Sequence, residues 1–132
     1  MNPLTVEDCL LSALRPYFPT AEMKPGTNFE KLAPSVLNLI AAVPQVHHTA
    51  GPLWKADATI ILAAPALLGV RLYADLDNAS RALVDALKDG NFAAAWPDGS
   101  PQFRGLFVTM NQTAQHDDSW RVTANVTVGV EE

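Results

Sequence analysis

Eleven residues near the end of the chain, Trp120 to Val130, alternate between apolar and polar side chains. Successive side chains of a β-strand point to opposite faces of a sheet, so this alternation predicts a strand with one buried face and one polar face. The apolar face carries Trp120, Val122, Ala124, Val126, Val128 and Val130. Such a strand is typical of an antiparallel sheet with one face open to water. Phe103 to Asn111 has the composition of a second strand, and the two together predict a long hairpin from Phe103 to Val130.

Two further strands are predicted in the middle of the chain. Val36 to Val43 is almost entirely apolar and lies between two prolines. This pattern favours a buried strand, although a short helix is an alternative for a run of this length. Ala56 to Ala63 is the second strand, and Pro65 ends it because proline has no N–H to donate to a ladder. Gln45 to Leu53 is predicted to be the loop between them.

A helix is predicted over Leu72 to Lys88, since apolar residues recur there at three- and four-residue spacing. The apolar stripe consists of Leu72, Leu76, Ala79, Leu83, Ala86 and Leu87. On the opposite face, Asp77 and Arg81 have the acid-first spacing that stabilises helices. Asp89-Gly90 is expected to end this helix, with Asn91 to Pro101 as a loop.

An earlier helix is predicted to begin at Thr5, whose hydroxyl suits a helix cap. It ends at Arg15-Pro16, because the residue before proline avoids helical backbone angles. Residues 19–33 contain a Pro-Gly turn signal and few apolar side chains, so they are predicted to form an extended arm or loop. The 132 residues suit a single domain, 1–132. The expected fold is α+β, with a mainly antiparallel sheet of about four strands, a long C-terminal hairpin and two packing helices.

The charge of the chain argues against a nucleic-acid-binding protein. The net charge is −5 and the pI is about 5.0. Binding to the DNA backbone depends on Lys and Arg, and the nine such residues are scattered without a basic run. The first residues show no basic region followed by an apolar core, and no apolar stretch is long enough to span a bilayer. We therefore expect a soluble protein made in the cytoplasm, with no membrane partner.

Three groups of residues are candidates for chemistry. His47 and His48 are adjacent, so on a strand they point to opposite faces and cannot easily share a metal. In a loop they could share one, but no further ligand lies at a familiar spacing. His116 precedes two aspartates in a segment whose composition suits a solvated turn. Cys9 lies in an apolar helical pattern and is expected to be a small core residue rather than a catalytic thiol. We expect no catalytic, cofactor-binding or metal-binding residue.

A second set of residues is considered for protein contacts. Trp54 and Trp96 lie in loops flanked by proline and glycine, where a tryptophan can be a core residue or an interface residue. Trp120 begins the apolar face of the last strand and is expected to lie in the core. The polar face of that strand offers Arg121, Thr123 and Asn125, which are candidates for a lumen or a neighbouring subunit.

Several segments together resemble one family of viral proteins. They are Pro34 to Val43, Asp57 to Leu62, the helix from Asp75 to Leu83 and the ending from Trp120 to Val128. In the order of their elements, their length and their residue pattern, they are similar to the tail terminator proteins of long-tailed bacteriophages. These are also called tail-completion or head-to-tail joining proteins. The resemblance covers most of the chain from Pro34 onward, whereas the long segment from Pro19 to Leu32 departs from the family.

The resemblance implies a structural virion protein rather than an enzyme. Members of this family form a ring, usually a hexamer, on the head-proximal end of the tail tube. The ring stops tube polymerisation and docks the head connector, and genomic DNA passes through its lumen without specific binding. The expected partners are therefore further copies of this chain, the tail tube protein and the head-tail connector protein. The alternatives are another phage neck or tail subunit, such as a tube or connector-completion protein, and a small metal-binding protein or enzyme.

Overall fold

The computed structural model describes residues 1–26, 36–65, 71–99, 101–110, 114–116 and 119–132. Within these residues the chain forms three α-helices, a short 3₁₀ turn and a six-stranded sheet. The helical elements are α1 (Pro3–Leu14), η1 (Arg15–Tyr17), α2 (Arg71–Ala86) and α3 (Asp89–Ala95). The strands are β1 (Glu22–Pro25), β2 (Asn38–Ala50), β3 (Leu53–Pro65), β4 (Gln102–Met110), β5 (Ala114–His116) and β6 (Ser119–Glu131). The predicted α+β class is confirmed.

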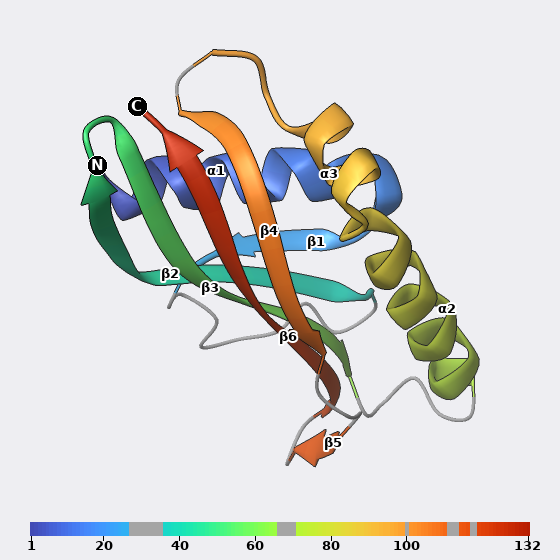
Figure 1. The fold of residues 1–132 in the computed structure, drawn as a ribbon. Helices are drawn as coiled ribbons and strands as arrows, with labels where there is room; N and C mark the ends of the chain where they lie inside the picture. The colour runs from blue at the N-terminus through green and yellow to red at the C-terminus, as the bar shows by residue number, and fades with distance from the viewer. Residues whose placement is uncertain (27–35, 66–70, 100, 111–113, 117–118) are drawn as a thin grey trace.

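The strands are ordered β1-β2-β3-β6-β4, and β5 pairs with the first residues of β6. β1 runs parallel to β2, whereas the other neighbours are antiparallel (Figure 1). The sheet is therefore mixed, and the prediction of about four strands is too low. The strands that were missed are β1 and β5, which have four and three residues and are too short to show a period. β1 lies in the segment 19–33 that was predicted to be an arm, whereas residues 27–33 lie outside the described part of the chain.

β2 runs through Pro44 as far as Ala50, so the loop predicted over Gln45 to Leu53 is wrong. Pro44 lies where the pairing of β2 with β3 shifts register, and the pairing of β1 with β2 has already ended at Ala41. Proline is tolerated at such a place because the ladder does not need its missing N–H. The two strands are long and form a second hairpin.

The turn of this hairpin depends on Gly51. Its φ is +54°, in the left-handed region that glycine adopts without steric cost. A Cβ added at Gly51 would meet no atom within 4 Å, so the backbone alone opposes a side chain there. We expect Gly51→Ala to lower the free energy of unfolding by about 1 kcal/mol, measured by urea denaturation. Gly105→Ala is the control: its φ is not positive and its Cβ position is also open, so it should not destabilise the protein.

The alternation predicted for the last strand is confirmed in β6. Its buried residues are Val122, Ala124, Val126, Val128 and Val130. β6 lies between β3 and β4, and its register with β4 runs from Glu131 opposite Gln102 to Ala124 opposite Met110. The predicted C-terminal hairpin is therefore present, and its strand β6 is central to the sheet because β3 and β4 pair with it on either side.

α1 begins earlier than the sequence suggested. Asn2, not Thr5, is the cap: the Leu4 N–H donates to Asn2 Oδ1 at 3.0 Å. Pro3 suits the first helical position, because an N–H at that position would have no acceptor within the helix and its absence costs nothing. At the other end, the helix stops at Arg15 and Pro16 as predicted and tightens into η1.

The predicted helix over Leu72 to Lys88 is confirmed as α2, but the loop expected after it is wrong. Lys88 has extended backbone angles, and the chain then forms α3. Phe92 of α3 is fully buried and Trp96 follows one turn later. The three alanines Ala93, Ala94 and Ala95 have the highest helix propensity, and burial of the Phe92 ring holds the helix against the sheet.

The helices cover one face of the sheet. α1 packs on β2 and β3, α2 on β3 and β6, and α3 on β4. In Figure 1, α1 crosses behind the strands and α2 runs down one side of the sheet. The apolar faces of β3 and β6 point toward these helices, so the polar faces of the same strands look outward.

Candidate interaction surface

The outward side of β3, β6 and β4 carries a polar patch around one phenylalanine. Thr127 of β6 lies opposite Asp57 on β3 and opposite Phe107 on β4. The next outward residue of β6, Asn125, lies between Thr59 and Thr109 in the same way. Cross-strand partners share a face, so these residues form one surface. We call it the Phe107 face, and it consists of Asp57, Thr59, Phe107, Thr109, Asn125 and Thr127.

Hydrogen bonds hold the polar groups of this face in place. The hydroxyl of Thr127 donates to Asp57 Oδ1 at 3.2 Å, and His47 Nε2 lies 3.0 Å from Asp57 Oδ2. The hydroxyl of Thr59 donates to Asn125 Oδ1 at 3.3 Å. The carboxylate of Asp57 therefore has a partner on each oxygen, and its charge is partly balanced by the donors.

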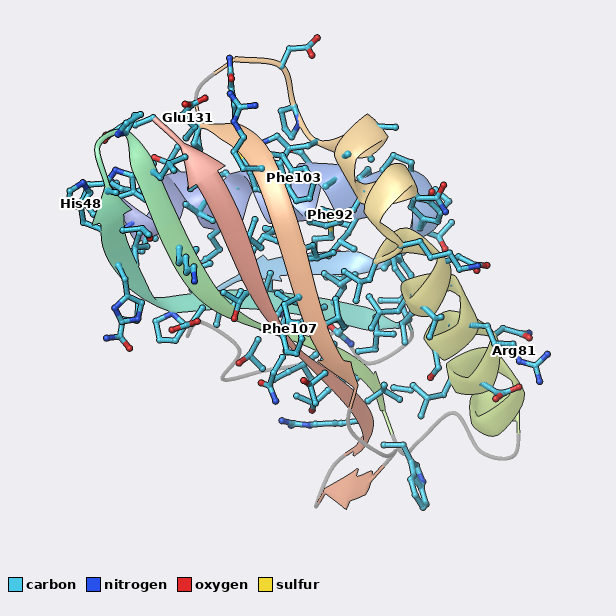
Figure 2. All side chains as sticks on the ribbon, viewed as in Figure 1. His48, Arg81, Phe92, Phe103, Phe107 and Glu131 are labelled. Atoms are coloured by element: carbon cyan, nitrogen blue, oxygen red, sulfur yellow. The ribbon has the colours of Figure 1, made fainter. Side chains whose placement is uncertain are left out.

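Phe107 is 71% exposed and projects from the outward side of the sheet (Figure 2). Beside it is a hollow of about 290 Å³, lined by the Phe107 face together with Pro44 of β2. A large aromatic ring left in water is uncommon and is enriched where proteins meet. On β2 the outward side of the sheet is not exposed at Ile40. This residue lies opposite Ile61, an outward residue of β3, and it is buried.

The sequence alone did not identify Phe107. Simple alternation along β4 places Phe107 on the same side as Phe103. The pairing with β6 shifts register between Phe103 and Gly105, so the alternation of side chains between the two faces of the sheet reverses at Arg104. Phe103 then packs against the core, whereas Phe107 points outward. A glycine inside a strand is the only sequence signal of such a bulge.

Three of the predicted interface residues lie on the outward side of β6. Arg121, Thr123 and Asn125 share this side, and only Asn125 belongs to the exposed centre around Phe107. Arg121 and Thr123 are half-buried. Trp120 lies on the inner side, partly buried against the core.

Trp96 is a core residue. It is 7% exposed, and its indole N–H donates to the carbonyl oxygen of Pro101 at 2.9 Å. Its ring centroid lies 5.6 Å from that of Phe92 and 5.7 Å from that of Phe103. The three rings join α3 to the start of β4.

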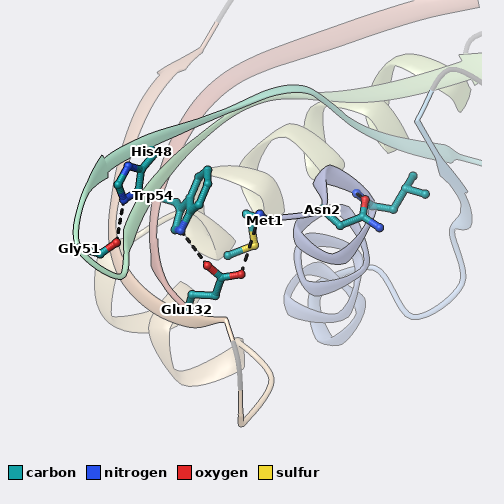
Figure 3. A network of polar contacts seen from close by, with 7 residues as sticks. Met1, Asn2, His48, Gly51, Trp54 and Glu132 are labelled. Atoms are coloured by element: carbon teal, nitrogen blue, oxygen red, sulfur yellow. Dashed lines mark hydrogen bonds and ion pairs between the residues drawn. The ribbon is translucent and has the colours of Figure 1, made fainter.

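Trp54 lies in a corner where the β2–β3 hairpin meets both ends of the described chain (Figure 3). Its indole N–H donates to Glu132 Oε2 at 3.0 Å, and the Met1 ammonium lies 3.9 Å from Glu132 Oε1. The ring of His48 lies 4.8 Å from the indole ring and its Nε2 lies 2.7 Å from the Gly51 carbonyl oxygen. Trp54 therefore joins the hairpin to Glu132, the residue that follows β6, and is apart from Arg121, Thr123 and Asn125.

The histidines do not meet at one place. His47 lies opposite Lys55 and contacts Asp57, whereas His48 lies opposite Trp54. Both belong to β2 rather than to the predicted loop, so they point to opposite faces as neighbours on a strand do. The side chain of His116 lies outside the described part. Among the side chains that are described, no three of His, Cys, Asp or Glu come close enough to bind a metal ion together.

Cys9 is partly buried against the core. Burial raises the pKa of its thiol, and the negative charge of Asp8 raises it further. A raised pKa lowers the fraction of thiolate, which is the reactive form. The environment of Cys9 therefore suits packing better than nucleophilic chemistry.

None of the helices in the described part of the chain combines the length and apolar character that crossing a bilayer requires.

Comparison with known proteins adds no family assignment. No protein-family model matches the sequence, and a search of curated proteins finds no match.

Proposed function

We propose that this protein is a tail terminator of a long-tailed bacteriophage. In this role it forms a ring, usually a hexamer, at the head-proximal end of the tail tube, where it ends polymerisation of the tube and joins it to the head connector. The proposed location is the virion tail. The partners are further copies of the chain, the tail tube protein and the connector protein.

The observation that carries this proposal is that helices cover one side of the sheet while the other side is exposed. Three helices cover one side of a mixed sheet in the described chain, and the other side presents an exposed aromatic ring on a largely uncharged surface. The resemblance of the segments from Pro34 onward adds the element order. A domain of this kind is suited to packing against further protein, because a surface depleted of charge and bearing an aromatic residue is typical of interface centres.

The charge of the chain fits the passage of DNA. With a net charge of −5, a ring of these subunits has an acidic field. DNA would be repelled from such a lumen rather than retained, so it passes without specific binding.

The test is the assembly state of the purified protein. We expect light scattering and native mass spectrometry to give a closed multiple of the 14.2 kDa subunit mass, and negative-stain microscopy to show rings. The same protein should bind the ends of purified tail tubes and block their further growth. A protein that stays monomeric at high concentration and does not bind tube ends would contradict the proposal.

A phage that lacks this gene product separates the related structural roles. Loss of a terminator leaves overlong or unjoined tails, whereas loss of a tube protein leaves no tails. Overlong tails would therefore indicate a terminator, whereas unjoined tails of normal length would leave the connector-completion role open as well.

A further inference from the structure

A second exposed surface lies on α2. Val84 is 48% exposed, in the middle of the helix side that points away from the core. Two ion pairs flank it: Arg81 with Asp77 at 3.1 Å, and Lys88 with Asp85 at 3.1 Å. We call the surface formed by these five residues the Val84 face.

Both faces carry little net charge in a chain with five excess negative charges. On the Val84 face two acids and two bases cancel. The Phe107 face carries one charge, that of Asp57, and Lys55, the neighbouring outward residue of β3, lies just outside the face. At least four of the five excess negative charges therefore lie outside the two faces.

This distribution of charge selects a second copy of the chain as the partner. Two copies with a net charge of −5 repel each other, and they approach at least cost through surfaces that carry little net charge. A basic partner would gain little from such surfaces, because electrostatic recognition needs opposite potentials. Each face also has an exposed apolar side chain, Phe107 or Val84, that contact would remove from water.

We propose that the Phe107 face of one copy packs against the Val84 face of the next. The two faces belong to different layers and look in different directions: Phe107 projects from the sheet and Arg81 projects from α2 (Figure 2). A contact between two different faces is head-to-tail, so it adds copies in one rotational sense and closes into a ring when the rotation fits. The inference rests on the proposed ring and names the subunit contact within it.

The chemistry of the two faces is complementary. Phe107 covers the exposed Val84, while the hydroxyl of Thr109 and the amide of Asn125 can donate to the carboxylates of Asp77 and Asp85. The charged side chains of the Val84 face keep their ion pairs, and the carboxylate of Asp57 keeps its contacts with Thr127 and His47, so each charge in the contact has a partner.

The test uses one charged substitution on each face. Phe107→Glu and Val84→Glu each place a carboxylate opposite an apolar group, and each should weaken association by at least about 30-fold, as expected for a central interface residue. Light scattering at a concentration where the wild type forms rings should then give the 14.2 kDa monomer. Leu4→Glu is the matched control, because Leu4 is 62% exposed on α1, away from both faces, and this variant should assemble normally.

Mixing the two variants tests the head-to-tail geometry. The Phe107→Glu chain keeps its Val84 face and the Val84→Glu chain keeps its Phe107 face, so one intact contact can form between them. We expect the mixture to give a heterodimer and nothing larger. Circular dichroism establishes that each variant is folded, and Phe107→Ser is the milder replacement if the glutamate disturbs β4.

Each other outcome overturns part of the scheme. Rings formed by either glutamate variant would exclude this contact while leaving the ring itself intact. Monomeric variants that do not complement each other would mean that the contact is not between these two faces. A wild-type protein that is monomeric throughout would instead refute the proposed ring function.

Discussion

Replacing Phe92 with alanine lowers the free energy of unfolding by about 3–5 kcal/mol, the usual loss for a buried aromatic side chain. Phe92 is completely buried on α3. Its ring centroid lies 5.4 Å from that of Phe103 on β4, in an edge-to-face arrangement. Removing the ring leaves a cavity between α3 and β4 and takes away the aromatic contacts. Urea denaturation followed by circular dichroism measures the loss.

Leu4→Ala is the control for this experiment. Leu4 is also an apolar helix residue, but it is 62% exposed, so its truncation should change stability by less than about 0.5 kcal/mol. A loss below about 1 kcal/mol for Phe92→Ala would mean that α3 does not belong to the cooperative core.

Replacing Glu7 with glutamine is expected to change how stability depends on pH. Glu7 of α1 is only 4% exposed, and its Oε2 accepts a hydrogen bond from the Val43 N–H at 3.3 Å. This N–H lies beside the irregular pairing at Pro44, where β3 does not use it. The other side of the carboxyl group is against Gly26, where an added Cβ would lie 3.0 Å from Oε1. The side chain therefore joins α1 to the irregular part of β2.

The sign of the pH effect follows from the pKa. Burial raises the pKa of Glu7 above its ordinary value of 4.5; the Val43 N–H lowers it and the charge of Asp8 raises it. A carboxyl group with a raised pKa binds its proton more tightly in the folded chain. Its contribution to stability is therefore greatest below pH 4.5 and declines as the pH rises from there to the folded-state pKa.

Glu7→Gln keeps an acceptor for Val43 but cannot ionise, so its stability relative to the wild type should improve as the pH rises above 4.5. Glu7→Ala leaves the N–H without a partner and should cost about 1–3 kcal/mol near pH 4.5, and the difference from the wild type should become smaller as the pH rises. Asp8→Asn removes the negative charge of an exposed neighbour that helps to raise the pKa of Glu7. The pH dependence of stability should therefore remain in this variant but become weaker. Parallel stability curves for the wild type and Glu7→Gln between pH 4 and pH 8 would contradict this account.

Much of the fold was predictable from periodicity. The apolar face of β6, the buried stripe of α2 and the ion pair between Asp77 and Arg81 all follow from local spacing along one element. The errors have local causes too: β1 and β5 are too short for a period, and Pro44 was taken to end a strand that continues past it. α3 was missed because Asp89-Gly90 was interpreted as the end of helical structure, although the alanine run that follows favours a helix.

The candidate surface was less predictable than the fold. The polar face of β6 identified Asn125, but Phe107 and Asp57 became neighbours only through the registers of three strands. The side on which Phe107 lies depends on one irregular pairing at Arg104, and the hydrogen bond between Asp57 and Thr127 joins residues that are far apart in sequence.

By itself, the sequence determined which residues must be buried, because burial of apolar side chains at a period of two or of 3.6 residues can be read along one element. It therefore determined the eleven-residue alternating strand and the long helix. Only the tertiary structure decided where the strands lie in the sheet, which side of β4 presents Phe107, and that Glu7 meets the backbone of Val43. These features depend on pairing between distant segments, and a one-residue shift in register moves every later side chain to the other face.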